Sequence, residues 1–253
     1  MNNSKRNAIL LTLLLFFPVY IATFSPAKSS ADYIASVHKN RNIVVYIKEP
    51  LLQDHVLLQV PTLMQFPELP RGCEVTSLAM MLNYAGVQVD KLTLANQVTN
   101  VPYFKDGYNG NPNQGFVGSM FTYKEPGLSV YNGPIEELAN RYLPNQIDNM
   151  SGKEFSAVKK KLNEGKPVWV IVGSTFTYIP EEKWETWNTI QGEIKITSKV
   201  HSVLVTGYDE NKVYFNDPFF SDGNRSAKYE DFVSSWAQFG SQAISYKSKN
   251  NED

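Results

Sequence analysis

The sequence is poor in the residues that build disulfides and metal sites. Its 253 residues include one cysteine, Cys73, so no disulfide can form within the chain. It has three histidines, His38, His55 and His201, and no two of them form a close pair. One cysteine without a close histidine pair leaves no ligand set with zinc spacing. We therefore expect no metal and no other cofactor.

The chain also lacks an excess of basic charge. Lysine and arginine number 24 against 25 aspartates and glutamates, which gives a formal net charge of −1. Proteins that bind nucleic acid neutralise phosphates with clustered positive charge. This balance excludes a nucleic-acid partner from our expectations.

An apolar run at the start of the chain is typical of a targeting segment. Residues 8–24 are largely apolar, follow Lys5 and Arg6, and precede several small residues. This pattern predicts that residues 1–31 are a signal peptide, with an uncleaved N-terminal anchor as the alternative. We expect a secreted or cell-surface protein that contacts a membrane only through this segment, if it is retained.

The remaining chain is long enough for one sizeable core. Residues 32–54 carry mixed charge and a short β-like run, which indicates a linker or an extra edge strand. Residues 55–253 are the predicted single folded domain, with a polar tail at its end.

Helical patterns dominate the first half of this domain. Apolar residues at spacings of three and four predict a helix that begins at Cys73 and stops at Gly86. Ser151 and Glu154 have the spacing of a capping box. Pro134 is expected at the first position of its helix. Further helices are expected near residues 90–98, 134–143, 152–164 and 229–239.

The second half changes to β-branched and aromatic runs. Residues 209–212 have the composition of a tight hairpin turn between two of these runs. Helices followed by a largely antiparallel sheet give an α+β fold. The glycine- and asparagine-rich residues 100–132 are expected to form an ordered loop over a cleft. Strands are expected at residues 167–174, 199–209, 212–218 and 242–247.

Cys73 is a candidate nucleophile because of its place at a helix start. The first turn of a helix presents unpaired N–H groups and the positive end of the dipole, which favour a thiolate. A thiol with an ordinary pKa of about 8.5 can fall well below 7.5 there, so we expect a lowered pKa for Cys73. The alternative is an inert buried cysteine that acts as a small hydrophobe.

His201 and Asp217 are candidate partners of this thiol. His201 lies in a predicted strand, and strand alternation places it on one face with Val203 and Val205. Asp217 follows after one hairpin turn, so the two side chains can lie side by side. An acid bonded to the imidazole Nδ1–H would fix its tautomer. The alternatives are a structural strand histidine and a turn-forming aspartate before Pro218.

Two further polar residues flank the cysteine. Gln65, eight residues upstream, could donate a side-chain N–H that joins the Cys73 backbone N–H in binding an oxyanion. The alternative is a solvated loop glutamine. Glu74 is expected to complement the helix dipole.

Aromatic residues of the long loop have two open interpretations. They could line a substrate groove or form a small core under the loop, and the same holds for Trp184 and Trp187. The loop aromatics are Tyr103, Phe104, Tyr108, Phe116, Phe121, Tyr123 and Tyr131.

Together these motifs resemble family 39 of the papain-like cysteine peptidases. Gln65 before "GCEVTSLAMMLNYAG", then "GNPNQGFVG", "VYNGPIEELA", "WNTIQGEI" and "HSVLVTGYDENKVYFNDP", resemble family segments in order across roughly residues 58–247. The likeness is greatest to secreted, stand-alone bacterial relatives of the bacteriocin-leader-processing peptidases. It implies a papain-like α+β fold with N-terminal helices packed on a C-terminal antiparallel sheet. It also implies Cys73 as nucleophile, His201 as base, Asp217 as its orienting residue and Gln65 in the oxyanion hole.

Three functions remain in competition. The leading hypothesis is a secreted thiol hydrolase that cleaves a peptide or amide bond of a peptide or protein substrate. A cell-wall amidase or an acyl transferase would use the same residues. A binding domain that keeps the fold without catalysis is the third, because fold does not determine function.

Overall fold

The middle of the fold is an antiparallel sheet of seven strands. The computed structural model describes residues 52–247, so the predictions for residues 1–31 and for nearly all of 32–54 lie outside the described residues. The strands of the sheet are β1 (Val56–Leu57), β6 (Ile147–Asn149), β7 (Val168–Gly173), β10 (Val200–Tyr208), β11 (Lys212–Asn216), β12 (Arg225–Lys228) and β13 (Ala243–Tyr246). They lie in the order β12-β11-β10-β7-β13-β6, and β1 pairs with β10.

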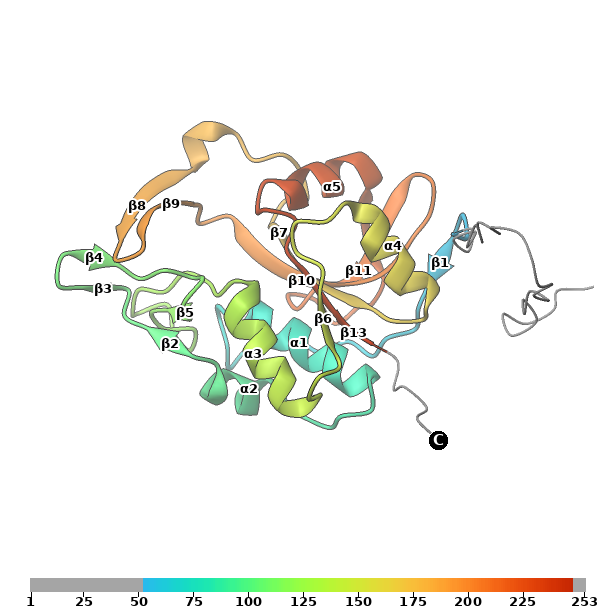
Figure 1. The fold of residues 1–253 in the computed structure, drawn as a ribbon, viewed down its shortest axis with the longest axis horizontal. Coiled ribbons are helices and arrows are strands. Elements are labelled where there is room, and N and C mark those ends of the chain that lie inside the picture. The colour runs from blue at the N-terminus through green and yellow to red at the C-terminus, as the bar shows by residue number, and fades with distance from the viewer. Residues whose placement is uncertain (1–51, 248–253) are drawn as a thin grey trace, which may run out of the picture. The chain divides into compact units, whose positions relative to one another are not determined.

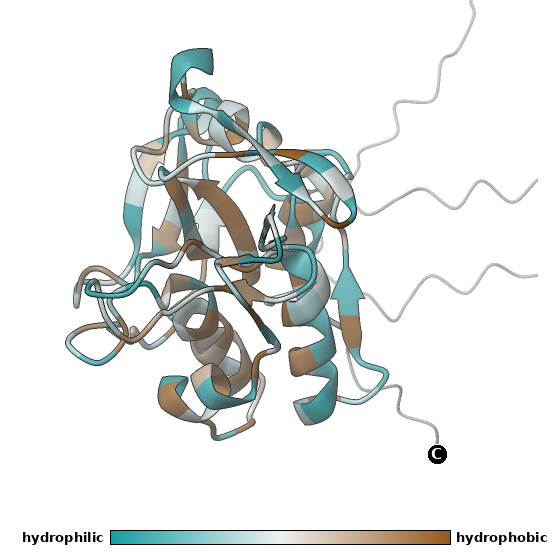
Figure 2. Cartoon of the chain, turned by 90° about the vertical axis from the view of Figure 1, so that its left-hand side faces the viewer, coloured by the Kyte–Doolittle hydropathy of each residue, from teal (hydrophilic) through white to brown (hydrophobic). Residues whose placement is uncertain are grey.

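Both faces of this sheet are buried. In β7, Trp169 and Ile171 point into one apolar core, whereas Val168, Val170 and Val172 point into another on the opposite face. This is the alternation that a strand covered on both sides requires. The central strands carry the hydrophobic colour in Figure 2.

Three helices cover one face and two cover the other (Figure 1). The first core is closed by α1 (Cys73–Tyr84), α2 (Lys91–Gln97) and α3 (Asn132–Tyr142), and the second by α4 (Phe155–Asn163) and α5 (Tyr229–Ala237). The predicted α+β class, with N-terminal helices on an antiparallel sheet, is confirmed. The later helices α4 and α5 add a third layer.

The first helix is held tightly against the sheet. Its first ten residues are all buried. The indole Nε1 of Trp169 donates to the Glu74 carbonyl at 3.0 Å, and Ser77 Oγ donates to the Ser202 carbonyl at 3.2 Å. At the preceding Gly72, an added Cβ would lie 2.5 Å from the Leu69 Cβ, so the chain needs glycine to enter the helix here. These contacts fix the position of Cys73 at the helix start.

Two predicted helix starts need correction. The capping box is wrong: α4 begins at Phe155, and Ser151 Oγ instead accepts a hydrogen bond from the Ala243 N–H in β13. Pro134 is the third residue of α3 rather than the first, a position that also tolerates proline because the first N–H groups of a helix have no intrahelical acceptor.

Short strands organise the loops on one side of the domain. The predicted ordered loop at residues 100–132 contains several two-residue strands. A hairpin that the sequence analysis did not predict lies beside it (Figure 1). These strands are β2 (Asn100–Val101), β3 (Phe104–Lys105), β4 (Tyr108–Asn109), β5 (Phe116–Val117), and the hairpin β8 (Glu185–Thr189) and β9 (Gly192–Ile196), preceded by the 3-10 helix η1 (Glu181–Lys183). Within residues 52–247, no helix has the length and apolarity needed to cross a bilayer.

The burial of α1 leads to a stability prediction. Leu78 is fully buried between α1 and the sheet, whereas Leu92 in α2 is 38% exposed. Leu78→Ala should lower the free energy of unfolding by about 2–5 kcal/mol, because it leaves a cavity in the core. Leu92→Ala is the matched control and should change it by less than about 1 kcal/mol. Urea denaturation measures both, and equal losses would contradict this assignment of the core.

Candidate active site

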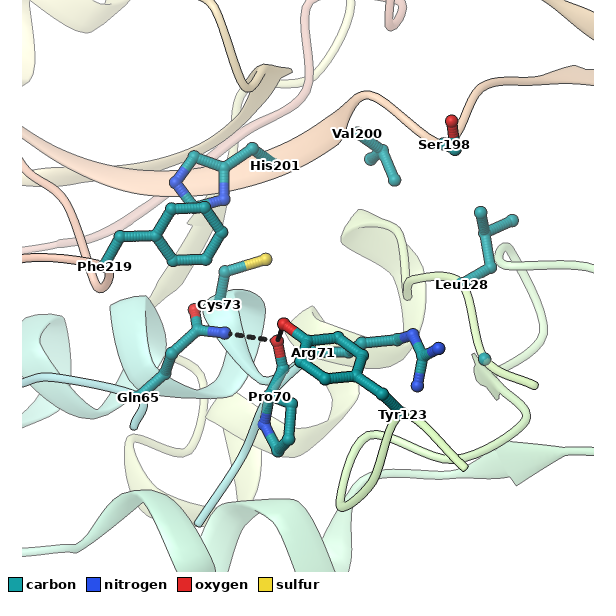
Figure 3. A pocket seen from close by; sticks show the side chains of 11 residues that line it. Gln65, Pro70, Arg71, Cys73, Tyr123, Leu128, Ser198, Val200, His201 and Phe219 are labelled. Carbon is teal, nitrogen blue, oxygen red and sulfur yellow. Dashed lines mark hydrogen bonds between the residues drawn. The ribbon is translucent and has the colours of Figure 1, made fainter. Parts of the chain in front are cut away.

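Cys73 lies at the bottom of a pocket of about 300 Å³ between the helix start and the sheet. It is the first residue of α1, and only 7% of its surface is exposed. Figure 3 shows it beside His201 and Gln65, with Arg71 and Tyr123 nearby. The pocket is lined by Gln65, Pro70, Arg71, Cys73, Tyr123, Gly127, Leu128, Ser198, Val200, His201 and Phe219.

His201 and Asp217 form a buried pair, as the hairpin spacing predicts. His201 Nε2 lies 2.8 Å from Asp217 Oδ1, and both side chains are at least 98% buried. The contacting ring atom is Nε2 rather than the expected Nδ1. An Nε2–H bonded to the carboxylate leaves Nδ1 as the nitrogen that can accept a proton. The pair therefore holds the imidazole in one orientation with its second nitrogen available.

The hairpin between β10 and β11 brings these two residues together. Its turn forms as predicted, because Asp209 Oδ1 accepts the N–H groups of Asn211 and Lys212. The ladder ends at the pair Leu204 and Asn216, so Asp217 follows directly after the last paired residue of β11. His201 lies three residues before Leu204 on β10. Both side chains therefore lie just beyond the end of the pairing between β10 and β11.

Phe219 completes the surroundings of the imidazole. Its ring centroid lies 4.3 Å from that of His201, and its N–H donates to Asp217 Oδ1 at 3.0 Å. The ring therefore packs on the imidazole, while its backbone helps to hold the acid. Phe219 was not among the predicted site residues. Its position two residues after Asp217, on the other side of Pro218, was the available signal.

Gln65 reaches the pocket, but its amide is engaged differently from the prediction. It is fully buried, and its Nε2 donates to Leu69 O at 3.0 Å and to Pro70 O at 2.8 Å. An amide nitrogen carries two hydrogens, so both are in use. Gln65 Oε1 has no hydrogen-bond partner among residues 52–247 and points upward toward Cys73 in Figure 3. The expected N–H donor thus faces backbone carbonyls in this structure, because the nearby chain bends back over it.

The loop that carries Gln65 is tied to the loop that carries Asp217. The Gln65 N–H donates to Pro218 O at 2.8 Å. The Lys91 ammonium donates to the carbonyls of Met64, Gln65 and Phe66. The alternative of a solvated glutamine is therefore wrong, since both the side chain and the backbone of Gln65 are fixed.

The Cys73 thiol itself is bonded to an acid. Sγ donates to Glu74 Oε2 at 3.3 Å, and no hydrogen bond joins it to His201 among those formed within the described residues. Burial and the neighbouring Glu74 charge raise the pKa of the Cys73 thiol well above its usual range, and the Ser202 backbone N–H opposes them only in part. The predicted lowering of this pKa is wrong, because desolvation of the thiolate outweighs the effect of the helix start.

Glu74 has a different environment from the one expected. A first-turn glutamate that complements the dipole is usually at the surface, but Glu74 is only 1% exposed. Its Oε1 accepts a short hydrogen bond from Ser129 Oγ and another from the Val130 N–H. Burial raises the pKa of the Glu74 carboxyl, and its hydrogen bonds, led by that from Ser129, oppose this. This side chain therefore joins α1 to the long loop.

Arg71 forms the wall opposite the imidazole. Its Nη1 donates to the carbonyls of Ser119, Thr122 and Glu125, and its guanidinium lies 4.8 Å from the centre of the Tyr123 ring. Tyr123 OH in turn donates to Pro70 O at 2.9 Å. These contacts hold the loop at the edge of the pocket. The sequence analysis did not single out Arg71, although it lies two residues before the cysteine.

The aromatic residues divide between the two interpretations. Tyr123 lines the pocket, whereas Phe116 and Tyr131 belong to the main core. Tyr103 packs edge-on against the buried Trp187, and Trp184 packs against Phe239. The remaining three loop aromatics, Phe104, Tyr108 and Phe121, are exposed.

Gly127 is needed where the loop passes the pocket. An added Cβ at Gly127 would lie 2.1 Å from the Ser119 carbonyl oxygen, so a side chain there would push the two loop segments apart.

In the part of the chain that the structure describes, no three histidine, cysteine or acidic side chains gather as they would to hold a metal ion.

Comparisons with known proteins found a matching family model and several similar proteins. The family model described as "Peptidase_C39 like family" matches residues 57–244. The uncharacterized protein YvpB of Bacillus subtilis (strain 168) is 50% identical over 182 residues, which are 72% of this chain and 71% of that protein. A crystal structure from Bacillus anthracis, provisionally assigned as a C39-like peptidase, is 45% identical and has a TM-score of 0.77. The match covers 78% of this chain and 99% of that one.

A more distant structure was also found. A cysteine protease of Carica candamarcensis, in complex with E-64, is 10% identical with a TM-score of 0.35, over 77% of this chain and 98% of that one. A likeness at this level carries no argument.

The raised pKa of the Cys73 thiol leads to a pH prediction. Above the ordinary thiol pKa of about 8.5, the unfolded chain loses the proton while the native protein keeps it. The unfolding free energy of the wild type should then fall relative to that of Cys73→Ser, by up to about 1.4 kcal/mol per pH unit. Urea denaturation at pH 8, 9 and 10 measures the difference. Parallel pH curves for the two proteins would contradict the raised pKa.

Proposed function

Because this chain belongs to the Peptidase C39-like family, we propose that it is a cysteine peptidase that cleaves a peptide or amide bond with Cys73, His201 and Asp217. One observation carries the proposal. Residues far apart in the sequence meet at one pocket: His201 Nε2 bonds to Asp217 at 2.8 Å, and both Cys73 and His201 line the pocket. This supports a nucleophile, a base and an orienting acid of the kind that acyl transfer requires.

The first half of the reaction forms an acyl-enzyme. The Cys73 thiol passes its proton to His201 Nδ1, and the sulfur attacks the substrate carbonyl carbon. The carbonyl oxygen becomes an oxyanion as the C–S bond forms. His201 then gives the proton to the leaving amine as the C–N bond breaks. Asp217 stabilises the imidazolium that exists between these two steps.

The second half releases the acyl group. A water molecule gives a proton to His201 and attacks the thioester carbon, and the C–S bond breaks. The proton returns to the sulfur, and the carboxylic acid product leaves. Each proton that His201 takes is therefore returned, so the enzyme regains its starting state.

The Cys73 N–H and the Gln65 side chain are the two candidate donors for the oxyanion. Cys73 is the first residue of α1, so its N–H has no intrahelical acceptor. Gln65 can contribute only if one of its N–H groups leaves a backbone carbonyl. We assign the constant contribution to the Cys73 N–H and a substrate-dependent one to Gln65.

The substrate and location follow from the sequence expectations. The proposed substrate is a peptide or a protein, with no role for nucleic acid. We place the enzyme outside the cytoplasm, as a secreted or cell-surface protein, on the basis of the N-terminal apolar run.

Replacing the sulfur tests the proposed function. Cys73→Ala should reduce hydrolysis of a peptide library by at least about 10³-fold, because no nucleophile remains. His201→Ala should have a similar effect. His55→Ala is the matched control: it lies at the surface against Tyr214 and should keep full activity. Mass spectrometry of the cleaved peptides is the measurement.

The same assay separates the competing functions. Cleavage of cell-wall fragments but not of polypeptides would identify an amidase. Products joined to an added amine would identify an acyl transferase. If wild type and Cys73→Ala are equally inactive on all substrates, while a Cys73→Ala cell keeps its phenotype, the non-catalytic binding domain is correct.

The acid behind the imidazole leads to a separate prediction. Asp217→Ala removes the acceptor of the Nε2–H and should lower kcat by about 10- to 10³-fold. Asp217→Asn keeps an oxygen at that position and should retain more activity than the alanine variant. Steady-state kinetics compare them. Equal loss in both variants would mean that the charge of Asp217, rather than its hydrogen bond, is required.

A further inference from the structure

Glu74 is a buried acid that the proposed reaction does not use. Its side chain is only 1% exposed, and no ion pair formed within residues 52–247 includes it. A carboxylate buried without a cation is costly and needs strong hydrogen bonds to stay ionised. Glu74 also follows the proposed nucleophile directly in the sequence, so a buried acid at this position can affect the thiol.

The two oxygens of Glu74 face different partners. Oε1 accepts hydrogen bonds from Ser129 Oγ and the Val130 N–H, which fixes the carboxyl group in the long loop. Oε2 accepts the hydrogen bond from the Cys73 thiol at 3.3 Å. The first oxygen is thus an anchor, and the second is presented to the sulfur.

This arrangement makes two acceptors compete for one thiol proton. One is Glu74 Oε2, which accepts the thiol's hydrogen bond in this structure, and the other is His201 Nδ1, which the proposed reaction requires. A carboxylate beside the sulfur also opposes formation of a thiolate, because two negative charges in a buried site repel each other. A thiol bonded to Glu74 is therefore a resting nucleophile.

We propose that Glu74 is a positioning residue that keeps the Cys73 thiol protonated and bonded to Oε2, so that the sulfur must exchange this bond for one to His201 before it attacks. The inference rests on the proposed function, because it concerns the regulation of the same nucleophile. In the exchange, the thiol turns from Oε2 to Nδ1. The proton then moves from sulfur to nitrogen and leaves a thiolate and an imidazolium.

The other titratable and charged groups around this pair differ in their effects on the thiol. Tyr131 faces Glu74 from the loop, and burial together with the Glu74 charge raises the pKa of Tyr131. Asp217 lies behind His201, and its charge raises the pKa of the Cys73 thiol less than the Glu74 charge does. His201 is the group on the sheet side that can become a cation. Arg71 is the fixed cation of the pocket lining, and its Nη1 is directed to loop carbonyls.

A purely structural role for Glu74 predicts something different. In that case the carboxyl group only joins α1 to Ser129 and Val130, and its removal lowers stability without changing the thiol. The reactivity of the sulfur as a function of pH separates the two roles, because the anchoring bonds do not determine how easily the thiol loses its proton.

The test is the rate of Cys73 alkylation by iodoacetamide between pH 5.5 and pH 9. The chain has one cysteine, so every label reports on this sulfur. Glu74→Gln keeps the shape and an oxygen for Ser129 but removes the charge, and its amide can donate to a thiolate. Alkylation at pH 7 should be at least about tenfold faster than in the wild type, which corresponds to a pH profile shifted down by one unit.

Two further variants sharpen the comparison. Glu136→Gln is the matched control, because this glutamate binds Asn149 away from the pocket and should leave the profile unchanged. Glu74→Gln combined with His201→Ala should lose the gain at pH 7, since the released thiol would have no imidazole to accept its proton. A gain that persists without His201 would overturn the proposed exchange.

The remaining outcomes are also decisive. Identical profiles for the wild type and Glu74→Gln would overturn the inference. If Glu74→Gln does not fold, the wild type still gives a decisive result: a high plateau of alkylation below pH 7 would overturn the inference, because the thiol would then not be kept protonated. The pH profile of alkylation could shift in Glu74→Gln although neither the wild type nor any variant cleaves peptides. That result would overturn the proposed function and still support the role of Glu74 in keeping the thiol protonated.

Discussion

The packing of α1 against the sheet is the constraint on which the site depends. The Trp169 indole binds the Glu74 carbonyl, and Ser77 binds the carbonyl of Ser202, so the helix start is fixed both along the strands and across them. The sulfur at that start then lies beside β10, where the imidazole is held by an acid from the end of β11. A shift of the helix by one turn would move the sulfur by about 5 Å and separate these groups.

Burial has opposite effects on the two sides of this site. It strengthens the hydrogen bond between His201 and Asp217, because little water competes for the ring or the acid. It also makes a thiolate costly, and the Glu74 carboxylate adds to that cost. The start of the helix favours a thiolate, but the negative charge of Glu74, one residue further on, opposes this effect. The resting state with a neutral thiol follows from the sum of these effects rather than from any one of them.

Local patterns in the sequence predicted most of the fold and the meeting of His201 with Asp217. Apolar spacing predicted the start of α1 at Cys73, and the turn at residues 209–212 placed Asp217 next to His201. The missed hairpin of β8 and β9 is a local failure, but other failures involve contacts between distant segments. Ser151 binds a strand more than ninety residues away instead of capping its helix. The partners of Glu74 and the carbonyls that occupy Gln65 depend on how the loops pack, which no short pattern encodes.

The long loop and the Cys73 thiol are connected through one carboxyl group. Ser129 and Val130 donate to Oε1 of Glu74, and stronger donation there withdraws charge from Oε2, which weakens its hold on the thiol. The same loop forms the pocket wall through Gly127 and Leu128, and Arg71 and Tyr123 fix its other end. The wall of the pocket and the carboxyl group that accepts the thiol's hydrogen bond are therefore held by the same loop.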